Sequence, residues 1–128
     1  MFALAPFAMS RDHRKLRVFL SADRAVEAVY RITQAFPACE RYGLQAQLRR
    51  AAVSVPCNIV EGCARRSSLE YLNFLNVATG SAAEAAYLLD LALRLGFLKA
   101  AEHQPVAAVY ADIVSGLKSL VSSLEGRG

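Results

Sequence analysis

Histidine and cysteine are scarce in this chain, and their scarcity excludes most kinds of metal and catalytic site. The two histidines, His13 and His103, lie outside the expected core segments, so neither the Glu-x-x-His pairs of a di-iron bundle nor a Ser/His/Asp set can be assembled. The three cysteines are odd in number and lack metal-ligand spacing, which is typical of idle thiols in a reducing cytosol. We therefore expect no catalytic residue, no metal, no cofactor and no enzymatic activity.

Long uncharged runs are also missing. The longest extends from Tyr71 to Ala83, which is shorter than the ~18 residues that a membrane-spanning helix needs. Hydrophobic residues nevertheless make up 55% of the chain, and the mean hydropathy is +0.26. Much of this content is alanine and leucine, which favour helices. These values predict a cytoplasmic, all-α protein that has no membrane segment and buries extra surface by forming oligomers.

The first ten residues lack the basic start and the small-residue cleavage pattern of a secretory signal. They are apolar and include Pro6. Two interpretations stay open: a disordered leader, or a start codon assigned too far upstream. We expect residues 1–14 to be disordered or loosely ordered, and one domain to span residues 15–125.

Four amphipathic helices are indicated by apolar residues that recur at spacings of three and four. No segment shows sustained alternation with period two, so no strand is expected. The predicted helices span about residues 15–35, 43–64, 67–95 and 105–124. The connections between them are short, which makes consecutive helices neighbours in an antiparallel, up-down-up-down four-helix bundle.

Caps and prolines set the expected helix ends. Pro37 ends the first helix, because the residue before a proline is pushed out of the α region. Ser67 and Glu70 have the spacing of a capping box at the start of the third helix, and Gly96 suits its end. Pro105 is expected in the first turn of the fourth helix.

The third predicted helix is apolar around most of its circumference. Its apolar residues are Leu69, Leu72, Phe74, Leu75, Val77, Tyr87, Leu88, Leu89, Leu91, Leu93 and Leu95. A helix that is apolar on every side is buried on every side, whereas a bundle buries one stripe of each helix. We therefore expect its second face to pack against another subunit. Residues 80–83 form a small-residue patch that either permits close helix approach or is ordinary alanine-rich helix.

Positive charge is concentrated in the first half of the chain. Residues 1–66 hold eleven Lys and Arg against five Asp and Glu, whereas residues 67–128 hold four against six. The basic half either faces an anionic partner such as nucleic acid or is a solvated surface without a partner.

Arginine is the better nucleic-acid candidate because it binds phosphate in a bidentate manner. Few aromatic side chains lie near the arginine pairs in sequence, only Tyr42 and Tyr71, so we expect backbone-led, salt-sensitive binding. The candidate contacts to RNA or DNA are Arg49, Arg50, Arg65, Arg66, Arg14, Lys15 and Arg17.

The second predicted helix contains an interior proline, Pro56, which removes a backbone hydrogen bond and costs ~3 kcal/mol in an ordinary helix. Asn58 and Glu61 follow it on one helix face. In a structural interpretation, Asn58 donates to the Ala52 carbonyl that Pro56 leaves without a partner, and Glu61 pairs with an arginine. In a functional interpretation, both side chains contact a ligand or partner.

The segment around Pro56 also carries a signature, which continues upstream in Phe36-Pro37 and downstream in residues 66–67, 71–75 and 80–81. Over residues 15–124 the chain resembles the bacterial four-helix-bundle family that includes proteins encoded by intervening sequences of 23S ribosomal RNA genes. Cys57 and Val60 depart mildly from the residues more usual in that family. The signature residues are Tyr42, Gly43, Leu44, Gln47, Pro56, Asn58, Glu61 and Gly62.

The resemblance implies an antiparallel bundle that assembles as a homopentamer, has no established enzymatic activity, and uses the signature residues for structure or for subunit contacts. Distant relatives, the accessory proteins of diversity-generating retroelements, imply by analogy a basic pentamer that binds nucleic acid and a reverse transcriptase. We therefore expect a nucleic-acid-binding oligomer or, alternatively, a scaffold subunit for a protein partner such as a reverse transcriptase.

Overall fold

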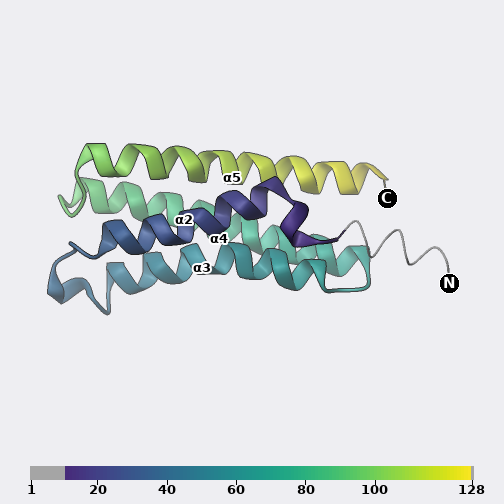
Figure 1. Cartoon of the computed structure of the whole chain (residues 1–128), viewed down its shortest axis with the longest axis horizontal. Coiled ribbons are helices and arrows are strands. Elements are labelled where there is room, and N and C mark those ends of the chain that lie inside the picture. Colours follow the sequence, from purple (N-terminus) through teal and green to yellow (C-terminus); the bar gives the residue numbers. More distant parts are fainter. Residues whose placement is uncertain (1–10, 128) are drawn as a thin grey trace.

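Four antiparallel helices form the protein in the computed structural model, which describes residues 11–127 (Figure 1). No strand occurs within these residues, so the predicted all-α bundle is confirmed. The helices run alternately up and down: α2 (Arg17–Thr33), α3 (Leu44–Cys63), α4 (Ser68–Arg94) and α5 (Ala100–Arg127).

Among the described residues, each helix contacts its two neighbours, and none contacts the helix diagonally across the bundle. The core between them combines many alanines with a few large side chains, of which Leu48, Ile59, Leu75, Leu89 and Tyr110 are fully buried. Alanine at so many inward positions lets the helix axes lie close together. The periodic stripes read from the sequence are therefore the faces that the fold buries.

The ends of α4 follow local signals. Ser67 is the N-cap, and its Oγ accepts a hydrogen bond of 3.0 Å from the backbone N–H of Glu70. Gly96 follows the helix with φ of 81°, a left-handed conformation that glycine adopts without strain. The N–H of Phe97 then bonds to the Ala92 carbonyl and that of Gly96 to the Leu93 carbonyl, which is a Schellman motif.

The start of α5 differs from the prediction. The helix begins at Ala100, so Pro105 lies inside it rather than in its first turn. The Glu102 carboxylate accepts a hydrogen bond of 3.0 Å from the Lys99 N–H, and the Lys99 carbonyl accepts from the His103 N–H. This local capping starts the helix early, and Pro105 leaves the Ala101 carbonyl without its usual backbone donor.

The predicted loose leader needs a partial correction. Residues 1–10 lie outside the described residues. Arg11 packs against the bundle and His13 against Phe19, whereas Arg14 is exposed. Arg11 is 6% exposed and donates to the Arg65 carbonyl, to the Ser67 carbonyl at 3.3 Å and to the Ser68 Oγ at 3.2 Å. The short 3-10 helix η1 (His13–Lys15) follows it. Arg11 thus supplies donors to the turn between α3 and α4.

One face of α4 carries exposed apolar side chains, and the exposed polar residues Asn73 and Glu84 lie in the same sector. Leu69, Val77, Tyr87 and Leu95 are between 53% and 69% exposed, and at 100° per residue they fall within about 80° of one another around the helix. Gly80 lies in the same sector, and a Cβ there would meet nothing within 4 Å. We call these five residues the α4 outer stripe. The small-residue patch is divided, since neighbouring Ala82 is buried in the core.

By length and composition only, α5 is the one helix among the described residues that is apolar enough to cross a bilayer. The side of α5 that faces the bundle supplies Val106, Tyr110, Ile113 and Leu117 to the core. A helix that packs in a bundle core passes the same test of length and composition.

Candidate nucleic-acid interface

Two tyrosines and three arginines line a hollow of about 590 Å³ at the end of the bundle where α2 connects to α3. No acidic side chain lines it. We call it the basic–aromatic hollow. Its lining residues are Tyr30, Arg41, Tyr42, Gln45, Ala46, Arg49, Arg50, Val53 and Ser54.

The connection between α2 and α3 is held by packing and by a cap. Phe36 is buried, with its ring centroid 5.7 Å from that of Phe97. The short 3-10 helix η2 (Ala38–Glu40) follows, and the Glu40 carboxylate accepts a hydrogen bond of 2.9 Å from the Leu44 N–H at the start of α3. A Cβ on Gly43 would lie 2.7 Å from Glu40 Oε1, so glycine leaves room for this cap.

The same connection presents Arg41 and Tyr42 to solvent. Tyr42 is 89% exposed, which makes it the most exposed large hydrophobic side chain of the described residues. Arg41 is exposed beside it, and Arg50 is exposed on α3. Within residues 11–127 neither guanidinium has a hydrogen bond or ion pair to another side chain. Both are therefore available to an anion.

Arg49 is held in place by hydrogen bonds to α2. Its Nε donates to Thr33 Oγ1 at 2.9 Å, and its Nη2 donates to the Tyr30 carbonyl at 3.3 Å. Gln45 adds a bond of 2.9 Å from Nε2 to the Thr33 carbonyl. These bonds tie α3 to the last turn of α2, where the Thr33 carbonyl also accepts from the Phe36 N–H at 3.1 Å. The positive charge of Arg49 suits the negative end of the helix dipole.

Arg49 also lies over the ring of Tyr30, with 4.4 Å between the guanidinium carbon and the ring centroid. This distance is within the range of a cation–π contact. Because the hydrogen bonds from Arg49 fix its position, the Tyr30–Arg49 stack is formed before any ligand arrives.

The remaining predicted contacts lie at the other end of α3. Arg65 packs over Phe74 at 4.8 Å, Arg66 is exposed, and Arg14 forms an ion pair of 3.0 Å with Asp12. Its hydrogen bonds to Asp12 lower the pKa of that carboxyl. Lys15 and Arg17 are exposed nearby in η1 and at the start of α2.

The seven predicted basic residues therefore divide into two groups at opposite ends of the bundle. Fifteen residues of sequence separate Arg50 from Arg65, which corresponds to about 22 Å along a helix axis. Only the group at the α2–α3 end is combined with exposed aromatic rings.

Asn58 corrects one detail of the structural interpretation. Its Nδ2 donates to the Ser54 carbonyl at 2.8 Å and to Ser54 Oγ at 3.0 Å, not to the Ala52 carbonyl. The Ser54 and Ser81 hydroxyls are 2.7 Å apart. Asn58 therefore supports a polar contact between α3 and α4 instead of replacing the bond that Pro56 removes.

The other signature residues range from buried to exposed. Leu44 and Pro56 are buried, whereas Gln47 is exposed. Gly62 lies where α3 meets α4, and a Cβ there would be 2.9 Å from Phe74 Cβ and 3.1 Å from Tyr71 Cδ1. Glycine at this position permits the close approach of the two helices.

Glu61 is exposed and lies at the rim of a second groove, of about 430 Å³, between α2 and α3. We call it the acidic groove. Asp23 lies on the α2 side of it. The other lining residues are Phe19, Val26, Val53, Pro56, Cys57 and Val60.

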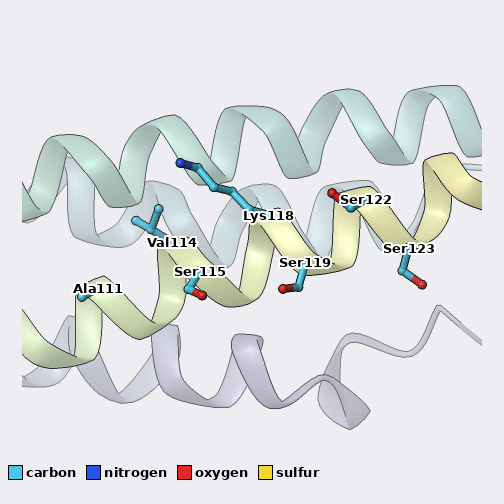
Figure 2. Close-up of a pocket in the computed structure, with 7 residues that line it drawn as sticks. All are labelled: Ala111, Val114, Ser115, Lys118, Ser119, Ser122 and Ser123. Carbon is cyan, nitrogen blue, oxygen red and sulfur yellow. The ribbon is translucent and has the colours of Figure 1, made fainter.

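A third hollow, of about 750 Å³, lies along α5, and its polar side chains do not form a binding site. Figure 2 shows Ser115, Ser119 and Ser123 on one side of the helix and Lys118 and Ser122 on the other, so their polar atoms do not converge. Within residues 11–127, no group of three His, Cys, Asp or Glu side chains is placed to hold a metal ion.

Tyr30 and Arg41 are members of the hollow that sequence reasoning missed. Tyr30 is about twelve residues before Tyr42, and only the antiparallel pairing of α2 with α3 brings the two side chains to one hollow. The signal in the sequence was its position beside the inward stripe at the end of α2. Tyr71, which sequence proximity had suggested, is buried under Arg11 instead, 5.0 Å from its guanidinium.

The chain matches a protein-family model, and its fold matches that of a solved structure. The family model described as 23S rRNA-intervening sequence protein matches residues 14–119. A protein of unknown function from the S23 ribosomal protein family of Bacteroides thetaiotaomicron VPI-5482 has a similar crystal structure, with a TM-score of 0.67 and 22% sequence identity. That match covers 80% of this chain and 96% of the other, and at this identity it shows the shared fold. No curated protein matches in sequence.

Proposed function

Because the chain belongs to the 23S rRNA-intervening sequence protein family, we propose that it is a non-enzymatic, self-associating cytoplasmic bundle that binds the backbone of RNA or DNA. The observation that carries this proposal is the basic–aromatic hollow, where two exposed arginines accompany two exposed tyrosines and no acidic side chain belongs to the lining.

The charge of the hollow favours phosphate. Arg41 and Arg50 have no acidic partner, so their charges are available to nucleic acid. Each guanidinium can bind two phosphate oxygens, and each neutralised phosphate releases counterions. Binding to a single strand should therefore weaken with salt, with a slope of about −0.7 per phosphate on logarithmic axes.

Self-association is the second part of the proposal, with a further copy of the chain as the occupant of the α4 outer stripe. Leu69, Val77, Tyr87 and Leu95 are apolar and widely exposed in the protomer, and glycine at position 80 leaves space for a closely packed partner. The family resemblance implies five copies. Several hollows on one assembly would raise the apparent affinity for one strand through multivalency.

Binding of a fluorescently labelled 20-nucleotide RNA at 50 mM and 200 mM salt tests the nucleic-acid part. We expect binding at the lower salt and a clear loss at the higher. The matched variants are Arg41→Ala/Arg50→Ala in the hollow and Arg65→Ala/Arg66→Ala at the opposite end. The first pair should weaken binding at least tenfold, and the second less than threefold. Absence of binding at 50 mM salt, or equal losses in the two variants, contradicts the proposal.

A second candidate function, an accessory subunit for a protein partner, is favoured by the acidic groove. Phe19, Val26 and Val60 give the groove an apolar lining, and Asp23 and Glu61 supply negative charge. These features suit a partner helix that carries apolar and basic side chains. Nuclease-resistant capture of one dominant protein, lost in Asp23→Lys/Glu61→Lys, would support this function, and capture that nuclease abolishes would count against it.

A further inference from the structure

We infer that the basic–aromatic hollow selects single-stranded nucleic acid, with an unpaired base stacked on Tyr42 and neighbouring phosphates bound by Arg41 and Arg50. This inference rests on the proposed function, because it names the form of nucleic acid that the same hollow accepts.

Tyr42 has the properties of a stacking platform. Its side chain is 89% exposed, so the ring contributes little to the core of its own protomer. The backbone around it is held on both sides, since the Gly43 N–H bonds to the Glu40 carbonyl at 3.0 Å and the Leu44 N–H to the Glu40 carboxylate at 2.9 Å. The backbone of this turn therefore loses little freedom when a base stacks on the ring.

Tyr30 and Arg49 provide a second platform in the same hollow. Tyr30 is 41% exposed, and the guanidinium of Arg49 lies 4.4 Å from its ring centroid. Aromatic rings and guanidinium planes are both surfaces on which unpaired bases stack. The hollow therefore presents two flat groups, one on α2 and one at the turn before α3.

Positive charge flanks these platforms at both sides. Arg41 adjoins Tyr42 in the chain, and Arg50 follows about two helical turns later on α3. Backbone phosphates next to a stacked base can thus reach a guanidinium on either side. This combination of aromatic faces and a basic groove is the usual design of proteins that bind single strands without sequence preference.

A duplex fits the hollow less well. Its bases are stacked on one another, and exposing one face to Tyr42 costs a few kcal/mol of unstacking and unpairing. A duplex at the hollow would gain phosphate contacts from the arginines but no stacking on Tyr42. We therefore expect the hollow to bind a single strand more tightly than a duplex.

Fluorescence anisotropy with the full chain tests this inference. The probes are a labelled 12-nucleotide single strand of mixed sequence and the same strand annealed to its complement, both at 50 mM salt. We expect the single strand to bind at least tenfold more tightly. Tyr42→Ala should weaken single-strand binding about 5- to 150-fold, the range for loss of one stacked base, and should leave duplex binding unchanged. Tyr42→Phe, which keeps the ring, should retain wild-type affinity.

Gln104→Ala is the control, because Gln104 is exposed on α5 and does not line the hollow. Equal binding of both probes, or full affinity in Tyr42→Ala, overturns the inference and leaves backbone binding by the hollow intact. A preference for duplex that disappears in Arg65→Ala/Arg66→Ala also overturns it. Failure of both probes to bind refutes the proposed function itself.

Discussion

The absence of a side chain at Gly62 lets α3 and α4 approach each other closely. A Cβ at this position would lie 2.9 Å from Phe74 Cβ, a distance that forces one helix to move. We expect Gly62→Ala to lower the free energy of unfolding by about 1–3 kcal/mol, as overpacking usually does. Urea denaturation at a fixed protein concentration measures the change.

Gly126→Ala is the control for that substitution, since a Cβ at Gly126 meets nothing within 4 Å. Alanine has the higher helix propensity, so this variant should be as stable as the wild type or slightly more stable. Equal effects of the two substitutions would contradict the close approach at Gly62.

The hydroxyl group of Tyr110 should also affect the stability of the fold. Its side chain is fully buried in the core, and its hydroxyl has no hydrogen-bond partner among the residues that the structure describes. Burying an unpaired hydroxyl costs about 1–3 kcal/mol. We therefore expect Tyr110→Phe to raise the free energy of unfolding by about 1 kcal/mol in urea denaturation at neutral pH.

Tyr110 should also make the free energy of unfolding depend on pH. Burial raises the pKa of the Tyr110 phenol above its ordinary value, which is about 10. The folded state therefore holds this proton after the unfolded state has released it. The contribution to stability is complete below about pH 10 and is lost above it, by up to ~1.4 kcal/mol per pH unit.

Tyr110→Phe removes this loss, so the stability difference between variant and wild type should widen as the pH rises above 10. Denaturation series at pH 7, 9 and 11 measure it. A difference that is constant with pH would show that solvent reaches the phenol in the folded protein. A variant less stable than the wild type at pH 7 would show that the hydroxyl is hydrogen-bonded in solution.

At the scale of the helices, α3 caps its neighbour α2 through Gln45 and Arg49. Arg49 and Arg50 are adjacent in sequence but differ in role, since Arg49 bonds to α2 and Arg50 is exposed to solvent. Arg49→Ala should lower the free energy of unfolding by about 1–3 kcal/mol, because hydrogen bonds from a charged donor are lost. Arg50→Ala should change it by less than about 0.5 kcal/mol.

Arg50 should matter for nucleic-acid binding and not for stability. Arg50→Ala is expected to weaken binding of the single strand while its thermal unfolding stays at the wild-type temperature, as followed by circular dichroism. An Arg49→Ala protein with unchanged stability would refute the capping role of Arg49.

The helices were predictable from the sequence wherever one local signal decided them. Ser67 and Gly96 define the ends of α4 through hydrogen bonds and φ values that their residue types favour. The start of α5 was not predictable from Pro105, because the capping contact between Lys99 and Glu102 outweighs it.

The candidate site was predictable only in part. The arginine pair in α3 stands out in the sequence, whereas its association with Tyr30 depends on how two helices pair in space. Likewise, no sequence pattern distinguishes Arg49 from Arg50. That difference comes from the direction in which each side chain leaves α3.

At the scale of the whole molecule, the α4 outer stripe holds four of the eight exposed large hydrophobic side chains of residues 11–127. We expect purified wild-type protein to be an oligomer by size-exclusion chromatography with light scattering. Val77→Lys/Tyr87→Lys places two charges on the stripe and should shift the protein to monomers with the same helical content. Desolvating those charges at an apolar interface is unfavourable.

Ser119→Lys on the exposed side of α5 serves as the control and should leave the oligomer intact. A wild-type protein that is monomeric at tens of micromolar would contradict self-association. An oligomer that survives the two lysines on α4 would place the subunit interface on another face.

The central claim is that nucleic acid lies in the basic–aromatic hollow, and photo-crosslinking tests it most directly. Wild-type protein is irradiated with a single strand that contains 4-thiouridine, and the crosslinked peptides are identified by mass spectrometry. The account predicts crosslinks to Tyr42 and Tyr30 that 500 mM salt abolishes. Crosslinks confined to the Arg65–Arg66 end of the bundle or to the outer face of α4 would contradict it.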